Sequence, residues 1–193
     1  MLIDTAKRWT QWWCNAWEEA HPTWKARFSE QVGLPLSICE QLAQHRCEAF
    51  MSFAEITTEQ PPEPDDRVLQ WLTLNAAQNE LALMLVDHIC SSGHSDLPTL
   101  DEHDVWCRSV AKALRPGLWL HGHTADPRLL LGVWLGVRYW PRLRLYWPLD
   151  SLSDLAGHSL LLNAAAVSKL QTLWPAVLWR VTALNPPETV HAG

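Results

Sequence analysis

The chain has 193 residues, a formal net charge of −6 at pH 7, and a composition that is 48% hydrophobic and 19% charged. This balance excludes a disordered chain, and the acidic excess disfavours a dedicated nucleic-acid-binding protein, which is usually basic. The most unusual feature is thirteen tryptophans against three phenylalanines and two tyrosines. We expect most of these tryptophans to lie in a core, and some at interfaces, where an indole N–H finds a partner.

The N-terminus gives no indication of export or membrane insertion. Residues 1–20 contain Asp4, Glu18 and Glu19 and lack the apolar run of a signal peptide. The longest uncharged run, residues 155–168, is shorter than the ~20 apolar residues that a membrane-spanning helix needs. The five cysteines are scattered and form no CxxC motif. We therefore expect a cytoplasmic protein with reduced thiols.

Residues 2–20 form the clearest predicted amphipathic helix. Trp9, Trp12, Trp13 and Trp17 recur at helical spacing on one face, with charged and amide side chains on the other. A tryptophan stripe of this kind is typical of a core more often than of a partner groove. His21-Pro22 ends the helix, because the residue before a proline is disfavoured in the α region.

The next segment is predicted to hold two helices, over residues 23–31 and from Pro35 onward, separated by Gly33. The predicted inward face of the second contains Cys39, Leu42, Ala43, Cys47, Phe50, Phe53 and Ala54. Residues 57–66 (TTEQPPEPDD) cannot form a helix or a central strand. They form either the boundary between a helical subdomain (1–56) and a larger helical body (67–185), or a surface loop of a single domain (1–193), which we favour.

The remaining chain predicts helices over residues 67–90, 101–114, 127–140 and 159–184. In the helix over 101–114, Val105 and Trp106 are assigned to the inward face. Residues 142–147 alternate Arg, Leu and aromatic side chains, which predicts a half-buried strand whose mate is the segment 117–121. The expected fold class is therefore mainly α: a single helical domain with a small two-stranded β element.

Charge is divided along the chain. Residues 61–104 hold nine acids and the single base Arg67, whereas residues 105–148 hold seven of the fifteen Lys and Arg residues and one acid, Asp126. The two segments either neutralise each other or present opposite patches to different partners. On the predicted strand, Arg142 and Arg144 would form an exposed positive row beside Tyr146, which favours protein docking.

Metal or thiol chemistry is the alternative. His103 and Cys107 share a helix face at i, i+4, and His121 and His123 follow in a glycine-containing turn. Four such ligands could hold tetrahedral zinc, although no zinc signature is matched. The chain also lacks GxSxG, P-loop, GxGxxG and HExxH motifs. We therefore expect no enzyme and no cofactor, and keep a small zinc- or thiol-dependent enzyme as the alternative.

Three segments resemble the SctK/YscK/OrgA family, cytosolic accessory proteins of the type III secretion sorting platform. The first is the aromatic N-terminal helix running into His21-Pro22 and Trp24. The second is Trp106-Cys107-Arg108 followed by Leu114-Arg115-Pro116. The third is the Trp134-Leu135 helix with the segment PRLRLYWP at residues 141–148. Together they cover less than half of the chain.

The resemblance implies a non-enzymatic protein at the inner-membrane face of the secretion apparatus. It would link the inner-membrane ring protein (SctD type) to the pod protein (SctQ type). Arg142, Arg144 and Tyr146 are then the predicted docking residues. The second candidates are Arg138 and the acidic run of Glu63, Asp65 and Asp66. A secretion chaperone or regulatory binding module is a further alternative, although a chaperone is expected to contain more strands than the two predicted.

Overall fold

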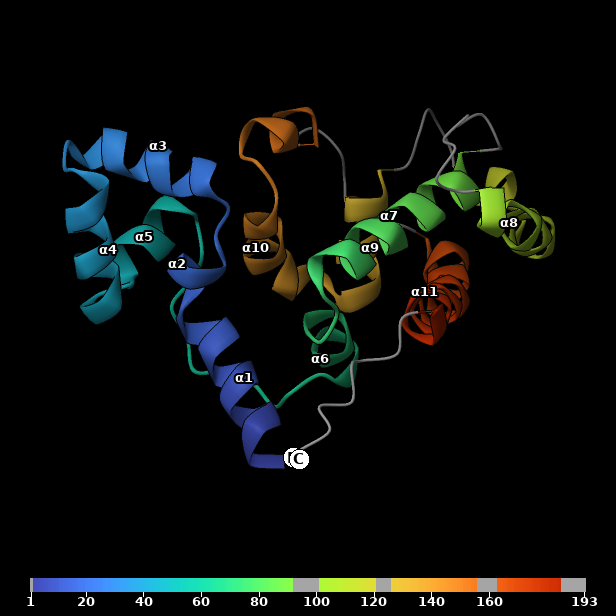
Figure 1. Ribbon diagram of the computed structural model, residues 1–193, viewed down its shortest axis with the longest axis horizontal. Coiled ribbons are helices and arrows are strands. Elements are labelled where there is room, and N and C mark those ends of the chain that lie inside the picture. Colours follow the sequence, from blue (N-terminus) through green and yellow to red (C-terminus); the bar gives the residue numbers. More distant parts are fainter. Residues whose placement is uncertain (1, 92–100, 121–125, 156–162, 185–193) are drawn as a thin grey trace, which may run out of the picture. The chain divides into compact units, whose positions relative to one another are not determined.

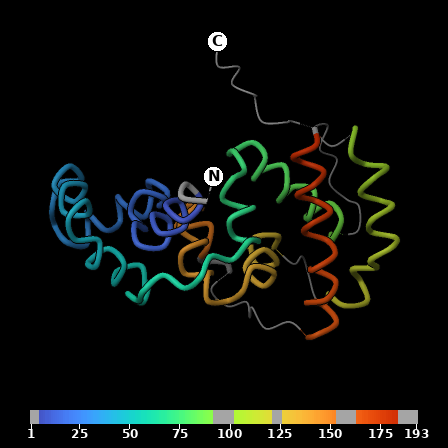
Figure 2. Tube along the Cα trace, turned by 90° about the horizontal axis from the view of Figure 1, so that it is seen from below, coloured from blue at the N-terminus to red at the C-terminus, as the bar shows by residue number. Residues whose placement is uncertain are grey.

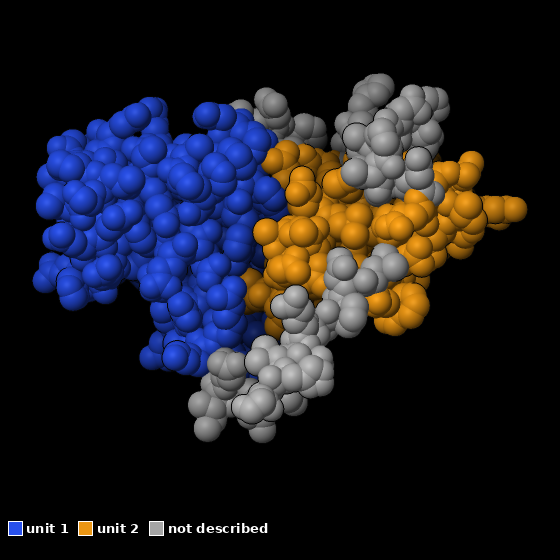
Figure 3. All heavy atoms as spheres, viewed as in Figure 1, with its two compact units in different colours: residues 1–69, 136–158 blue, residues 70–135, 159–193 orange. Residues whose placement is uncertain are grey.

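The computed structural model describes residues 2–91, 101–120, 126–155 and 163–184, and nearly all of its regular structure is helical (Figure 1). The chain divides into two compact units (Figure 3). Unit 1 combines residues 1–69 with 136–158, and unit 2 combines residues 70–135 with 159–193. The predicted helical class is confirmed, whereas the single-domain organisation stays a prediction.

Unit 1 begins with five helices and is completed by a later segment of short helical turns. The five are α1 (Leu2–Cys14), α2 (Ala16–Glu19), α3 (Pro22–Val32), α4 (Leu36–His45) and α5 (Glu48–Phe53). The later segment contains η3 (Val137–Tyr139), α10 (Trp140–Leu143), η4 (Arg144–Tyr146) and η5 (Asp150–Leu155), the η elements being 3₁₀ helices.

The core of unit 1 is aromatic. Trp9, Trp12 and Trp13 are at most 2% exposed, and all three rings contact Tyr139 with centroid distances of 6.0–6.2 Å. Trp17 is 5% exposed and continues the cluster edge-on against Phe50. Offset and edge-to-face ring pairs add stability beyond the area they bury. The prediction that the tryptophan stripe packs in a core is therefore confirmed.

Three hydrogen bonds join the start of α3 to η4 and the turn that follows it. The amide of His21 donates to the carbonyl of Leu145 (2.7 Å), and the indole Nε1 of Trp24 donates to the carbonyl of Trp147 (3.0 Å). The amide of Leu149 donates to the hydroxyl of Thr23 (3.0 Å). Segments more than 120 residues apart in sequence are thus fixed side by side within unit 1.

The proline-rich segment after α5 is irregular, as predicted, and it covers part of the tryptophan stripe. The indole Nε1 of Trp9 donates to the carbonyl of Pro62 (2.8 Å), and that of Trp13 donates to the carbonyl of Glu59 (2.9 Å). A buried indole N–H needs such an acceptor. The segment is therefore a covering loop whose backbone carbonyls complete the aromatic core.

Unit 2 is built around α11 (Ala164–Leu184), which contacts α7 (Ala76–Cys90), α8 (Asp101–Leu114) and α9 (Pro127–Leu135). Figure 2 shows α11, in red, running alongside α8. Trp174 of α11 is fully buried, stacks on Trp134 (5.7 Å) and meets Trp71 edge-on (6.1 Å). The last predicted helix is therefore the centre of this unit. Among the described helices, none is both long enough and apolar enough to cross a bilayer.

The predicted β element is not found in the described part of the chain. Arg142 and Leu143 end α10, and the next three residues form η4. The predicted mate begins inside η2 (Pro116–Leu118), and its last residue, His121, lies outside the described residues. The strand prediction for residues 142–147 is therefore wrong, because the alternation there reflects two consecutive helical turns, α10 and η4, with Leu143 and Leu145 buried.

Four predicted helices are interrupted. The helix predicted over residues 127–140 ends as α9 at Leu135, and Gly136, at φ 118°, separates it from η3. The N-terminal helix breaks at Asn15, and the helix after Pro35 ends at His45 before α5 begins. The helix predicted from residue 67 becomes α6 (Asp66–Leu72) and α7. Asn75 caps α7, with a reciprocal hydrogen-bond pair between Asn75 and Gln78. Such a capping box satisfies two backbone donors at the start of a helix and therefore favours a new helix at this point.

Candidate interaction surface

Arg142, the first of the predicted docking residues, is buried. It is 4% exposed, and its guanidinium carbon lies 3.7 Å from the ring centroid of Trp13. Its Nε donates to the carbonyl of Trp13 (3.0 Å), and its Nη2 donates to the carbonyl of Thr57 (3.3 Å). Burial lowers the pKa of Arg142 from its usual value. The side chain therefore holds the aromatic core to the covering loop and is not presented to solvent.

Arg144 and Tyr146 also make internal contacts in unit 1. Arg144 donates to the carbonyl of Ala54, pairs with Glu55 (3.3 Å) and lies over the ring of Trp24. The hydroxyl of Tyr146 donates to Glu19 (2.9 Å), and burial with the adjacent carboxylate raises the pKa of Tyr146 strongly. The exposed Arg/Tyr row that the strand would have produced does not form.

Arg138 is the exposed residue among the three arginines predicted for docking. Its guanidinium lies 5.7 Å from the ring of Trp13 and 5.4 Å from that of Tyr139. Among the acidic candidates, Glu63 and Asp66 are exposed. Asp65 pairs with Arg67 (2.8 Å). Burial alone would raise the pKa of Asp65, but the hydrogen bonds and charge of Arg67 hold it below its usual value.

Two of the four proposed metal ligands lie among the described residues and two do not. His103 and Cys107 are both 1% exposed on α8, whereas His121 and His123 lie outside the described residues. Within the described segments, no three His, Cys, Asp or Glu side chains are placed to hold a metal ion. His103 instead accepts from Nε of Arg180 (3.4 Å) and lies 3.3 Å from Glu102.

On the same helix, the predicted inward position of Val105 is wrong. Val105 is 72% exposed, whereas His103 and Cys107 take the buried positions. Burial lowers the pKa of His103, and it raises the pKa of Cys107 to about 11. It also raises the pKa of Cys90 to about 12. These two thiols are protonated at neutral pH and therefore lack the thiolate that nucleophilic chemistry needs.

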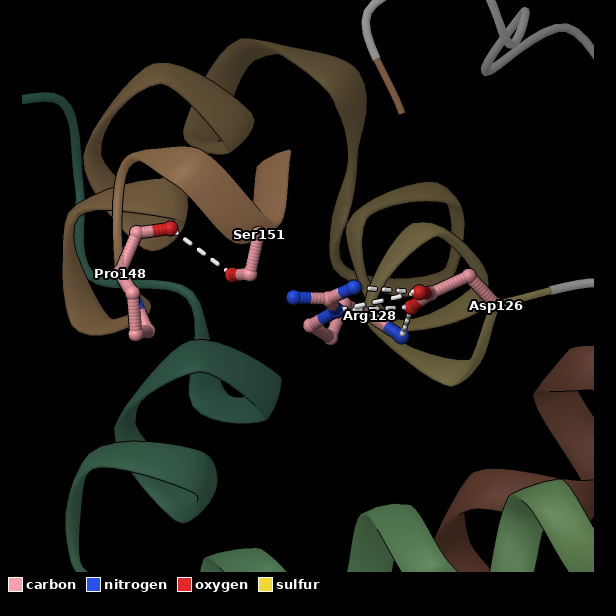
Figure 4. A network of polar contacts seen from close by, with 4 residues as sticks. All are labelled: Asp126, Arg128, Pro148 and Ser151. Atoms are coloured by element: carbon pink, nitrogen blue, oxygen red, sulfur yellow. Dashed lines mark hydrogen bonds and ion pairs between the residues drawn. The ribbon is translucent and has the colours of Figure 1, made fainter. Parts of the chain in front are cut away.

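Two further polar contacts are local to their own units. In unit 2, Asp126 and Arg128 form a bidentate pair in which Oδ2 of Asp126 lies 2.6 Å from Nη2 of Arg128 (Figure 4). In unit 1, the hydroxyl of Ser151 donates to the carbonyl of Pro148 (2.8 Å), also drawn in Figure 4. Arg128 is thus a further basic residue of the 105–148 segment that is engaged locally.

Unit 1 has an apolar surface that the sequence analysis did not identify. It surrounds the α3–α4 connection, at the end of unit 1 that carries α3 and α4 in Figure 1. Five large apolar side chains there are 39–46% exposed: Val32, Leu34, Leu36, Ile38 and Leu42. We call these five residues the apolar tip. Leu42 was predicted to face inward, and its 46% exposure overturns that assignment.

A pocket of about 590 Å³ opens on the same unit, beside the C-terminal end of α4. Its lining comes from α1, the α4–α5 connection, α5 and the covering loop: Trp13, Cys14, His45, Arg46, Cys47, Glu48, Met51, Thr58 and Glu59. Cys14 is exposed and Cys47 half-buried, and burial raises the pKa of Cys47. The pocket lies over the fully buried ring of Trp13 and carries two carboxylates and one arginine.

The apolar tip could have been found from one signal in the sequence. Ile38, Leu42 and His45 recur at i, i+4 and i+7 on the face of α4 that does not contain Cys39 and Ala43. A helix with apolar residues on two faces buries one and leaves the other for a second contact.

Comparison of the chain with protein-family models, curated proteins and solved structures finds no match.

Proposed function

We propose that this chain is a non-enzymatic binding protein of a type III secretion sorting platform, at the cytoplasmic face of the inner membrane. In this role it links the ring protein (SctD type) to the pod protein (SctQ type). The proposal starts from the resemblance of three segments to the SctK/YscK/OrgA family. It requires complementary surfaces rather than a catalytic site.

One observation supports it most. The first segment and residues 141–148 of the third lie together in unit 1, joined by direct hydrogen bonds, whereas Trp134 and Leu135 belong to unit 2. The His21-Pro22 step and Trp24 are bonded to Leu145 and Trp147 of the 141–148 segment. A family signature that is split in sequence but joined in space is expected when its residues build one scaffold. Here the scaffold supports both the apolar tip and the pocket.

The polar groups of the described residues also favour binding over catalysis. Arg142 and Tyr146 are used for internal packing, and the buried thiols of Cys90 and Cys107 have raised pKa values. The described residues with large exposed apolar side chains are instead concentrated at the α3–α4 connection. Exposed apolar patches on this scale are typical of protein-interaction sites.

The test is co-purification. The tagged chain is co-expressed with the SctD-type cytoplasmic domain and the SctQ-type protein of the same bacterium and purified at 150 mM salt. We expect at least one of the two to be retained in a stoichiometric complex. Retention of neither, by a chain whose circular dichroism shows a folded helical protein, would contradict the proposal.

A further inference from the structure

The end of the α3–α4 hairpin has an incomplete core. On α3, Trp24 and Phe28 are at most 6% exposed, but Val32, one turn further along the same stripe, is 41% exposed. On α4, Cys39 and Ala43 are buried, but Leu36, one turn before them, is 42% exposed. The inward stripes of both helices therefore continue beyond the part of unit 1 that covers them.

A second apolar stripe lies on the flank of α4. Leu34 precedes the helix, and Ile38 and Leu42 follow at intervals of four residues, 39–46% exposed. At ~1.5 Å rise per residue, the stripe is about 12 Å long. That length matches two to three turns of a helix lying along α4. Together with the hairpin end, it exposes an area on the order of a few hundred Å², the size of a functional patch.

The stripe leads into the pocket. His45 follows Leu42 on the same flank of α4 and is also part of the pocket lining. Trp13 lies beneath the pocket, fully buried, and is fixed before any partner binds, because it is bonded to Glu59 and stacked on Arg142. Met51 is a second lining residue, 5% exposed, and its flexible thioether can adapt to different side chains. Preorganised pockets of this kind typically receive the anchor residues of a partner.

The charges around the surface indicate what the partner carries. Residues 28–45 contain no Lys or Arg and two acids, Glu30 and Glu40. Glu30 is paired with Arg27 (3.2 Å), so Glu40, which forms no ion pair among the described residues, sets the charge of this stretch. The pocket adds the exposed carboxylates of Glu48 and Glu59 against the single base Arg46. An anionic membrane surface would be repelled, since its recognition needs clustered Lys and Arg. A basic partner is attracted instead.

We propose that the apolar tip and the pocket bind an amphipathic helix of a partner protein. The apolar face of that helix lies along Leu34, Ile38 and Leu42, one large apolar side chain enters the pocket, and a neighbouring Lys or Arg faces Glu48 and Glu59. This deepens the proposed binding function, on which it rests, by naming the class of partner segment. A second copy of this chain is a poorer occupant, because it brings the same acidic rim, and a stable dimer buries about 800 Å² per partner.

The test uses a defined probe, a fluorescein-labelled 16-residue helix of Ala, Leu and Lys. Its leucines occur at i, i+4 and i+8, and two lysines flank the central leucine. We expect fluorescence anisotropy with the full chain to give a dissociation constant of about 10–100 µM, corresponding to roughly −7 to −5.5 kcal/mol. The same peptide with Glu in place of Lys should bind at least tenfold more weakly.

Two variants locate the site. The double variant Ile38→Ser/Leu42→Ser should weaken binding of the lysine peptide at least tenfold, and Glu48→Lys/Glu59→Lys should reverse the preference between the two peptides. The matched control is Leu118→Ser, a change at a 70% exposed leucine of unit 2, which should leave binding unchanged. Circular dichroism must show native helicity in each variant.

The outcomes separate the inference from the proposed function. Absence of lysine-peptide binding, or binding that Ile38→Ser/Leu42→Ser leaves intact, overturns the inference even if platform proteins still co-purify. A dimer in sedimentation velocity that Ile38→Ser/Leu42→Ser dissociates also overturns it, since the occupant is then a second copy. Peptide binding with no platform protein retained in co-purification supports the helix site and contradicts only the platform assignment.

Discussion

At the scale of single residues, Arg142 combines contacts that are usually found separately. Its guanidinium stacks on Trp13 and donates to two backbone carbonyls, and among the described residues it forms no ion pair with a carboxylate. A buried cation is stable only when its donors are satisfied. The two carbonyl acceptors and the face of the indole therefore compensate for the water that Arg142 loses.

We expect Arg142→Met to destabilise the chain by about 3 kcal/mol, since it removes charge-assisted hydrogen bonds and a close cation–π contact. The free energy of unfolding in urea is the measurement. Arg138→Met is the matched control: Arg138 is exposed and lies further from the same ring, so its loss should stay below about 1 kcal/mol. Equal effects of the two changes would show that burial of Arg142 is not stabilising.

His103 predicts a dependence of stability on pH. Burial lowers its pKa in the folded chain, so the unfolded chain binds the proton more readily. The stabilising contribution of the neutral imidazole is present above the unfolded pKa of about 6.5 and is lost as the pH falls through the folded pKa. The free energy of unfolding should therefore fall between pH 7 and 5, and less steeply in His103→Gln. Identical slopes for the two proteins would contradict this.

At the scale of elements, the end of α8 is strained. Arg115 follows Leu114 with φ 53° and ψ 64°, the left-handed conformation that glycine adopts without a Cβ penalty. We expect Arg115→Gly to raise the free energy of unfolding by about 0.5–1 kcal/mol, and Arg115→Val to lower it, because a β-branched side chain is worst in this region. Thermal and urea unfolding of the two variants measure this, and the reverse order would rule out strain at this position.

The sequence predicted helices well where apolar periodicity was supported by local end signals. The range predicted for α8 is the range found, and Gly33, at φ 66°, ends α3 as expected. Sequence-based prediction failed where the local structure depends on tertiary contacts. Leu143 and Leu145 are buried on neighbouring helical turns and not on one face of a strand. Alternation of apolar and polar residues does not distinguish these two arrangements.

The candidate site was predicted only in part, for a related reason. Sequence reasoning identified Arg142, Arg144 and Tyr146 as unusual but could not show that residues 54–57 and Glu19 supply their partners. It also assigned Leu42 to the core, because both faces of α4 carry apolar side chains. Which face is covered depends on α3 and α5, and therefore on packing between elements rather than on the helix itself.

At the scale of the whole molecule, the chain is interleaved. Unit 1 needs residues 136–158 to complete a core that residues 1–69 begin, and unit 2 is formed from the chain on either side of that segment. Each unit has its own aromatic centre, around Tyr139 in unit 1 and around Trp174 in unit 2. A protein with two compact units can offer a separate surface for each of two partners, as a linking role requires.

Bridging is therefore the measurement that tests the account most directly. The SctD-type cytoplasmic domain and the SctQ-type protein are passed together through size-exclusion chromatography with and without this chain. We predict that the two proteins co-elute only when the chain is present. The double variant Ile38→Ser/Leu42→Ser should lower the apparent affinity of the ternary complex at least tenfold, whereas Leu118→Ser should leave it unchanged. Co-elution that is independent of the chain, or no ternary peak with the folded wild-type chain, would contradict the account.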